Sequence, residues 1–163
     1  MAILPFTKEF TQDVIDLILS IQAAEFDVHV TLDAQSELKN IPAFFQTGSG
    51  NFWIALAEGK VVGTIGLLDI GHNAVALRKM FVHADYRGQP HRAGQQLLDQ
   101  AFRWAETKDI NKIYLGTLDK FKAAHKFYEK SGFRLIAERE LPSYFPIMHV
   151  DTIFYERDLR SRR

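Results

Sequence analysis

The stretch with the clearest chemical character is a glycine-containing segment at residues 86–98, YRGQPHRAGQQLL, which runs into an apolar helical pattern. The first N–H groups of a helix have no partner within it and carry partial positive charge, so phosphate binds there when the backbone is accessible. Gly88 and Gly94 would make it accessible, while Arg87 and Arg92 supply side-chain donors. The segment is therefore a candidate pyrophosphate site, although an ordinary strand-to-helix turn explains the same residues.

Several other kinds of site have no support in the sequence. The chain has no glycine–lysine–serine/threonine run of the P-loop kind and no three-glycine dinucleotide fingerprint. Its six histidines show no HxxxH or HExxH spacing, and without cysteine it has neither thiolate metal ligands nor a cysteine nucleophile. We therefore expect no metal site and no disulfide.

The spacing of apolar residues predicts the helices and strands that precede the loop at residues 86–98. AILPF predicts a short edge strand, and Thr7 is expected to cap a helix. A shorter helix is predicted at residues 33–45. Two strands follow around the tight turn at Glu58-Gly59, and a third completes an antiparallel meander over residues 52–82. The apolar face of the first helix comprises Phe10, Val14, Leu17, Ile18 and Ile21.

The second half alternates helices and strands. After the loop comes a long helix with an apolar stripe, then a compact buried strand of the parallel type at 112–118. A helix at 119–130 ends at Gly132, a left-handed cap. Further strands are predicted at 133–139 and 148–159, with a proline-bracketed loop between them. This order predicts a mixed α/β layer with helices on both faces of the sheet.

Length and composition bound the class of protein. A chain of 163 residues, 47% of them apolar, suits one domain, residues 1–163, with a packed core. Its 20 basic and 20 acidic residues give zero formal net charge, which argues against a dedicated nucleic-acid or membrane-surface protein. No apolar run approaches membrane-spanning length, and MAILPFTKEF lacks the apolar stretch of a signal peptide. We therefore expect a soluble, cytoplasmic protein.

Three pieces of sequence carry a recognisable pattern together: FWIALAEGKVVGTIGLLDI, MFVHADYRGQPHRAGQQLLDQA and KAAHKFYEKSGF. In this combination they resemble the GNAT superfamily of acyl-CoA-dependent N-acetyltransferases. The first matches the family's antiparallel hairpin, the second its strand, YRGxGxG/A loop and helix, and the third its AxxxYxxxGF helix. The resemblance implies an α/β (α+β) fold of GNAT type, a mixed, mostly antiparallel central sheet with splayed middle strands and helices on both faces. It also implies transfer of an acetyl group from acetyl-CoA directly to a primary amine of a small molecule or peptide.

The resemblance places the acyl-CoA against one strand, the loop and a later helix. The strand would pair with the pantetheine arm, loop amides would hold the pyrophosphate, and arginines would be free to add charge-assisted bonds. Pro90 lacks an N–H and Arg92 replaces a family glycine, which shifts amide donation toward residues 91–95. Phe121 stands where members often have asparagine, and Lys122 could meet the 3′-phosphate of CoA or be simply solvated. The implied cofactor-binding residues are Met80, Phe81, Val82, Arg87, Gly88, Gln89, His91, Arg92, Ala93, Gly94, Gln95, Phe121 and Lys122.

The resemblance also implies a general acid. Tyr128 matches the family's tyrosine, which protonates the thiolate that leaves on acyl transfer, whereas the helical pattern alone would make it a core aromatic. No base is marked by a motif, and each candidate is also explained as a solvated side chain. The candidate bases are Glu25, Asp27, Asp69, His72 and His83.

Two further questions stay open at the level of sequence. Trp53, Tyr144 and Phe145 could line an acceptor pocket or form a subunit contact, in keeping with a homodimer. The changes at Arg92 and Phe121 leave a non-catalytic acyl-CoA binding or sensing module as the alternative to an enzyme. An interaction protein that shares only the fold is a third reading.

Overall fold

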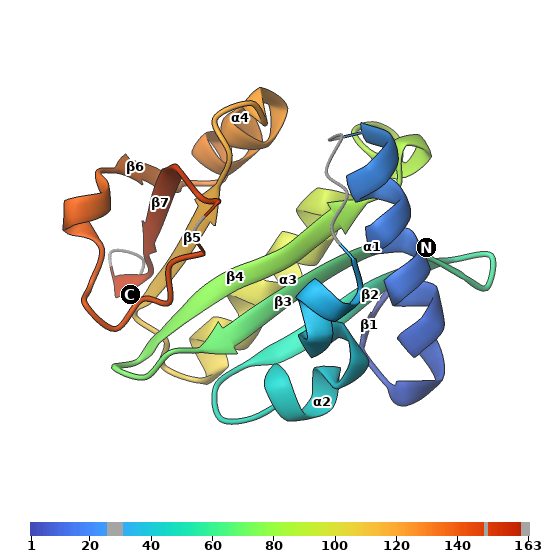
Figure 1. Cartoon of the computed structure of the whole chain (residues 1–163), viewed down its shortest axis with the longest axis horizontal. Coiled ribbons are helices and arrows are strands. Elements are labelled where there is room, and N and C mark those ends of the chain that lie inside the picture. The colour runs from blue at the N-terminus through green and yellow to red at the C-terminus, as the bar shows by residue number, and fades with distance from the viewer. Residues whose placement is uncertain (26–30, 149, 161–163) are drawn as a thin grey trace.

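The computed structural model of the chain describes residues 1–25, 31–148 and 150–160, and it is built around one seven-stranded sheet (Figure 1). The strand order is β1-β2-β3-β4-β5-β7-β6, in which β4 and β5 pair in parallel and the other described neighbours pair antiparallel. The strands are β1 (Ala2–Pro5), β2 (Asn51–Ala57), β3 (Lys60–Asp69), β4 (Ala74–Val82), β5 (Lys112–Thr117), β6 (Arg134–Ile136) and β7 (Ile153–Asp158). The helices are α1 (Thr11–Glu25), α2 (Ile41–Phe44), α3 (Ala93–Thr107) and α4 (Lys122–Lys130), with 3₁₀ helices η1 (Lys8–Phe10), η2 (Asp33–Lys39), η3 (Ala84–Tyr86) and η4 (Glu138–Glu140).

Helices cover both faces of the sheet, as predicted. On one face α1 and α2 bury an apolar layer that includes Val14, Ile18 and Phe45 against β2 and β3. On the other face α3 buries Leu97 and Ala101 against the same sheet. Figure 1 shows α1 in front of the strands and α3 behind them. Burial of these two layers is the main favourable contribution to the fold.

The parallel strands β4 and β5 separate soon after they begin. Their pairing joins residues 74–76 to residues 112–114 and ends there. Beyond this point β4 continues along β3 as far as Val82, while β5 continues along β7 as far as Thr117. The strands therefore diverge toward their carboxyl ends, and α4 lies at the open end (Figure 1). The prediction of splayed middle strands is confirmed.

A β-bulge in β4 lies just beyond the point of divergence. Arg78 pairs with Gly66 and Phe81 pairs with Thr64, so two residues of β4 oppose the single β3 residue between them. Lys79, the first of the two, has a φ of 55° in the left-handed region, and the Thr64 hydroxyl donates to its carbonyl at 2.6 Å. Because Thr64 is fully buried, this bond fixes the bulge from inside the sheet.

The bulge shifts the alternation of β4 side chains by one residue. Val75 and Leu77 before the bulge, and Met80 and Val82 after it, all pack on the α3 side. Phe81 packs on the α1 side instead. As a result, the side chains of Arg78 and Lys79, the two basic residues at the bulge, both lie on the side of the sheet that α1 and η2 cover.

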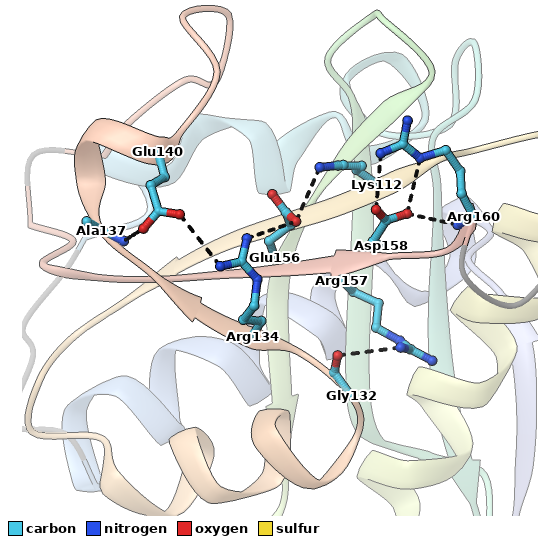
Figure 2. A network of polar contacts seen from close by, with 9 residues as sticks. All are labelled: Lys112, Gly132, Arg134, Ala137, Glu140, Glu156, Arg157, Asp158 and Arg160. Carbon is cyan, nitrogen blue, oxygen red and sulfur yellow. Dashed lines mark hydrogen bonds and ion pairs between the residues drawn. The ribbon is translucent and has the colours of Figure 1, made fainter.

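Ion pairs tie the C-terminal strands together (Figure 2). Glu156 of β7, with a side chain only 10% exposed, lies 3.2 Å from Lys112 of β5 and 3.5 Å from Arg134 of β6. Arg134 also reaches Glu140, which accepts a hydrogen bond from the Ala137 amide. The network thus joins three adjacent strands on the side of β5 away from β4.

Two predicted helix boundaries are wrong. The helix expected at 33–45 is two short pieces, η2 and α2, because Asn40 is non-helical at φ −145° and Pro42 has no N–H to donate. The helix expected from residue 119 begins at Lys122, since Phe121 (φ −88°, ψ 60°) lies outside the helical region. It ends as predicted, with Gly132 at a φ of 93°.

The other differences concern strand lengths and one cap. The strands expected at 133–139 and 148–159 are the shorter β6 and β7, and β7 starts at Ile153, where its pairing with β5 starts. Thr7 does precede the first helical turn, but its hydroxyl donates to Glu9 and does not cap a backbone group.

Candidate active site

A cavity of about 600 Å³ opens where β4 and β5 diverge. One wall is formed by residues 77–81 of β4, and a second by residues 115–118, at the end of β5 and just after it. Tyr128 of α4 forms part of a third wall. Gln22 of α1, residues of η2, and the segment before β7 close the other side. The cavity therefore lies between the elements predicted to hold an acyl-CoA and those predicted to border an acceptor.

The glycine loop meets the open end of β4 and α4. A Cβ placed on Gly94 would lie 3.7 Å from side-chain atoms of Met80, Val82 and Phe127. The start of α3, which carries Gly94, thus packs against both elements that border the cavity. Arg92 precedes this helix in the left-handed region at a φ of 50°.

Several amides at the start of α3 are available to a ligand. The first helical hydrogen bond runs from the Gln96 N–H to the Arg92 carbonyl at 3.1 Å, so the N–H groups of residues 93–95 have no acceptor within the helix. The Arg92 N–H itself donates to Gly88 O at 2.6 Å. Within the predicted range 91–95, the Arg92 N–H is therefore engaged, whereas the N–H groups of Ala93, Gly94 and Gln95 have no acceptor within the helix.

The side chains of the loop are already engaged. Arg87, expected to be free for phosphate, donates from Nε to Val82 O at 2.8 Å and lies 2.6 Å from Glu25 Oε1. The Gln89 amide, turned so that its oxygen faces Arg92, accepts from Nε of that arginine at 2.9 Å. The His91 ring packs on Tyr86, with centroids 4.6 Å apart. Each arginine thus already has a partner within the protein, and phosphate would have to be bound by its remaining N–H groups or in place of that partner.

Tyr128 is a deeply buried proton donor in the cavity lining, with 8% of the residue exposed. Its ring packs on Phe133 and Tyr155, with centroids 5.7 and 6.0 Å away. Burial raises the pKa of the Tyr128 phenol above its ordinary value of 10.0, so it keeps its proton at neutral pH. Its hydroxyl has no hydrogen-bond partner among the residues that the structure describes, and it can therefore donate to a ligand.

The remaining predicted cofactor residues fall into two groups. Met80, Phe81 and Phe121 line the cavity. Lys122 is exposed at the start of α4, where its ammonium lies 2.9 Å from Asp119. This position is compatible with a solvated side chain as well as with a contact to an outer phosphate.

The candidate bases lie away from the cavity. Asp69 accepts hydrogen bonds from the Ser49 and Gly71 amides. His72 stacks on Tyr144 at the turn between β3 and β4, near the end where β4 and β5 are still paired. His83 accepts from the Asp85 amide, and Glu25 pairs with Arg87. The structure thus brings none of these side chains to the cavity lining, and Asp27 lies outside the described residues.

Two carboxylates that sequence reasoning missed do line the cavity, Glu37 of η2 and Asp151 before β7. Asp151 lies against Gly116 of β5, where any side chain would collide with its carboxylate. Among the aromatic candidates, Phe145 lines the cavity, but Trp53 is 2% exposed and packs on Trp104, so its interpretation as a pocket wall is wrong.

Sequence reasoning also missed a polar cluster on the wall formed by the bulge. Lys79 Nζ lies 2.8 Å from Glu37 Oε1 and 2.7 Å from Gln35 Oε1. The Gln35 and Gln22 side chains exchange amide hydrogen bonds of 2.9 and 3.1 Å. These contacts join β4, η2 and α1. They could not be predicted from a local motif, because each depends on the tertiary fold.

The described residues contain neither a candidate metal site nor a helix that could span a membrane. Within residues 1–25, 31–148 and 150–160, no group of three or more His, Cys, Asp or Glu side chains is placed as metal ligands would be. No helix in the described part of the chain is long and apolar enough to cross a membrane.

Comparison with known proteins adds to this geometry. Residues 15–133, which include the hairpin, the loop and Tyr128, match the model of the acetyltransferase (GNAT) family. An acetyltransferase of the GNAT family from Staphylococcus aureus Mu50 is 40% identical, with a TM-score of 0.91 over 97% of this chain and 98% of that one. The PaiA N-acetyltransferase of Thermoplasma acidophilum, solved with coenzyme A, shares the fold at 17% identity, with a TM-score of 0.72 over 96% and 98% of the chains.

The curated relatives are longer proteins. N-acetylaspartate synthetase of Danio rerio is 32% identical over 107 residues, which are 64% of this chain and 37% of that protein. The present chain thus spans well under half of that relative's length. Together the family match, the nearly complete structural overlap and the splayed sheet confirm the resemblance read from the sequence: the chain belongs to the acetyltransferase (GNAT) family.

Proposed function

We propose that the chain is an N-acetyltransferase that transfers the acetyl group of acetyl-CoA directly to a primary amine. The observation that carries the proposal is the position of Tyr128. Its protonated hydroxyl, free of partners within the described residues, lines the cavity between the diverging strands. A proton donor in that place suits a reaction that expels a thiolate.

The reaction uses a proton donor, strand amides and carboxylates of the chain itself. The amine nitrogen bonds to the thioester carbonyl carbon, and the carbon–sulfur bond breaks. Strand amides near Phe81 and Val82 polarise the carbonyl, and the Tyr128 hydroxyl gives its proton to the sulfur. The surplus proton of the amine passes, directly or through water, to Glu37 or Asp151, the carboxylates that line the cavity. The carboxyl then loses this proton to water and the Tyr128 phenolate regains one from water, which restores both groups.

The proposal extends to the cofactor site and the setting of the enzyme. Residues 93–95 would hold the pyrophosphate through their amides, and strand residues 80–82 would pair with the pantetheine arm. Residues 1–163 would form one acetyltransferase domain that works in the cytoplasm, uses no metal and acts on a small-molecule or peptide amine. The balanced charge supports a partner other than nucleic acid. A homodimer remains a prediction.

Two measurements test this function. Calorimetric titration with acetyl-CoA tests the binding half, and absence of binding at millimolar ligand would refute it. Release of free CoA is then followed with a thiol reagent over a broad panel of amines. Because the chain has no cysteine, the reagent reports CoA alone. Binding without release for any amine would favour the non-catalytic acyl-CoA module instead.

A further inference from the structure

The guanidinium of Arg78 lines the cavity and has no direct counter-ion among the residues that the structure describes. Its Nη2 donates to Pro146 O at 3.0 Å, and within the described residues it forms no ion pair. A guanidinium has five N–H donors, so most of its donors are left for another partner. Arg78 is half-buried, so its remaining donors are accessible to an anion that enters the cavity.

Lys79, the adjacent cation, is in the opposite situation. It lies 2.8 Å from the Glu37 carboxylate and 2.7 Å from the Gln35 amide oxygen, and its side chain is 12% exposed. Its charge is therefore balanced within the protein. Of the two basic residues at the bulge, Arg78 is the one left to meet a ligand.

The bulge explains why Arg78 faces the cavity. In a regular strand Arg78 and Lys79 would face opposite sides of the sheet. The extra residue opposite β3 leaves both for the side away from α3. Burial lowers the pKa of Arg78 from its ordinary value, while the nearby carboxylates of Glu37 and Asp151 act against this shift. The guanidinium and the Glu37 and Asp151 carboxylates line the same cavity.

We propose that the amine acceptor carries a carboxylate, as an α-amino acid does, and that Arg78 binds this carboxylate. The inference rests on the proposed function and names the acceptor class of that same cavity. The planar guanidinium can grip a carboxylate through two parallel hydrogen bonds. Glu37 and Asp151 then receive the ammonium end of the same molecule, so a zwitterion matches the charges around it.

The same arrangement disfavours other acceptors. A polyamine or an aminoglycoside would place several positive charges beside the unpaired Arg78, and like charges repel most strongly in a partly buried site. A carboxamide of an amino acid keeps the amine but cannot form the paired, charge-assisted bonds. Selectivity between an amino acid and its carboxamide is therefore a direct measure of the Arg78 contact.

The test compares CoA release for a panel of L-amino acids, each with its own carboxamide, in the wild type and in Arg78→Met. We expect Arg78→Met to lower kcat/KM for the carboxylate form about tenfold or more, the loss typical of a charge-assisted hydrogen bond. The carboxamide should change by less than about twofold. The ratio of kcat/KM for the carboxylate to that for the carboxamide is compared between wild type and Arg78→Met. The different basicity of the two amines affects both proteins equally and therefore cancels.

Controls separate this contact from folding. Arg78→Lys keeps the charge but loses the fork, so its carboxylate preference should fall between those of the other two proteins. Arg139→Met removes an exposed arginine of η4 and should leave the ratio unchanged. Equal losses for carboxylate and carboxamide, or no preference in the wild type, would overturn the inference.

A failure of the proposed function is distinguishable from a failure of the Arg78 site. If none of the amines in the panel causes the wild type to release CoA, the proposed activity is wrong. The same amino acids are then titrated calorimetrically into the protein saturated with CoA. Binding that weakens about tenfold in Arg78→Met supports the carboxylate site, while equal or absent binding in both proteins refutes it.

Discussion

Replacement of Tyr128 by phenylalanine should separate catalysis from stability. The substitution removes the hydroxyl alone, and within the described residues that hydroxyl makes no hydrogen bond. The free energy of unfolding should therefore change by no more than about 0.5 kcal/mol. A general acid contributes about 10²–10⁴ to the rate. Its loss should lower kcat at least about a hundredfold, equivalent to roughly 2.7 kcal/mol in the barrier.

Tyr155→Phe is the matched control, since it removes a second tyrosine hydroxyl from the same apolar cluster. That hydroxyl donates to Glu129 Oε2 at 2.7 Å, so its loss should cost about 1–2 kcal/mol of stability and leave kcat nearly unchanged. Steady-state CoA release and urea denaturation, measured on both variants, give the pattern. If Tyr128→Phe turned over at the wild-type rate across pH, the role of Tyr128 as the acid would be wrong.

Three further outcomes follow from the same geometry. Arg92→Ala removes a loop cation and should weaken acetyl-CoA binding by calorimetry about threefold to tenfold, as loss of one charge-assisted contact would; unchanged affinity would leave the amide cradle alone as the pyrophosphate site. Gly66→Ala places a Cβ 2.9 Å from Phe52 and should cost about 1–3 kcal/mol in urea denaturation, unless the ring yields. Burial raises the pKa of both the Tyr155 and the Tyr114 phenol to about 12. The hydrogen bond to Glu129 adds to this shift for Tyr155, and the charge of Glu156 adds to it for Tyr114. The stability due to these raised values is complete below the unfolded pKa of about 10 and is lost toward pH 12, so the urea midpoint should fall in that window, and less so in Tyr114→Phe.

The family and the layered fold could be predicted from the sequence because their signals are local or periodic. The stripe of α3, the Glu58-Gly59 hairpin and the cap at Gly132 each depend on neighbouring residues, and each is confirmed. Tyr128 could be singled out because its place in the helix matches a motif, although its catalytic role is still a prediction.

The acceptor half of the site could not be predicted in the same way. Strict alternation through AVALRKMFV would place Lys79 with Val75 and Leu77 on the α3 side. The bulge reverses this, and a positive φ at lysine has no sequence signature. Glu37 and Asp151 were missed for a related reason, since they reach the cavity from segments far apart in the chain.

The ion pair at the bulge also decides where a substrate carboxylate can bind. Both Lys79 and Arg78 are cations in the cavity wall, so charge alone would allow either to receive it. Glu37 lies 2.8 Å from Lys79, and a second carboxylate at that lysine would be brought close to Glu37 and repelled by it. Arg78 has donors left over and a carbonyl, not a carboxylate, as its hydrogen-bond acceptor. A substrate carboxylate is therefore better placed at Arg78 than at Lys79, which leaves the amine to lie on the side of Glu37 and Asp151, where its proton can be removed.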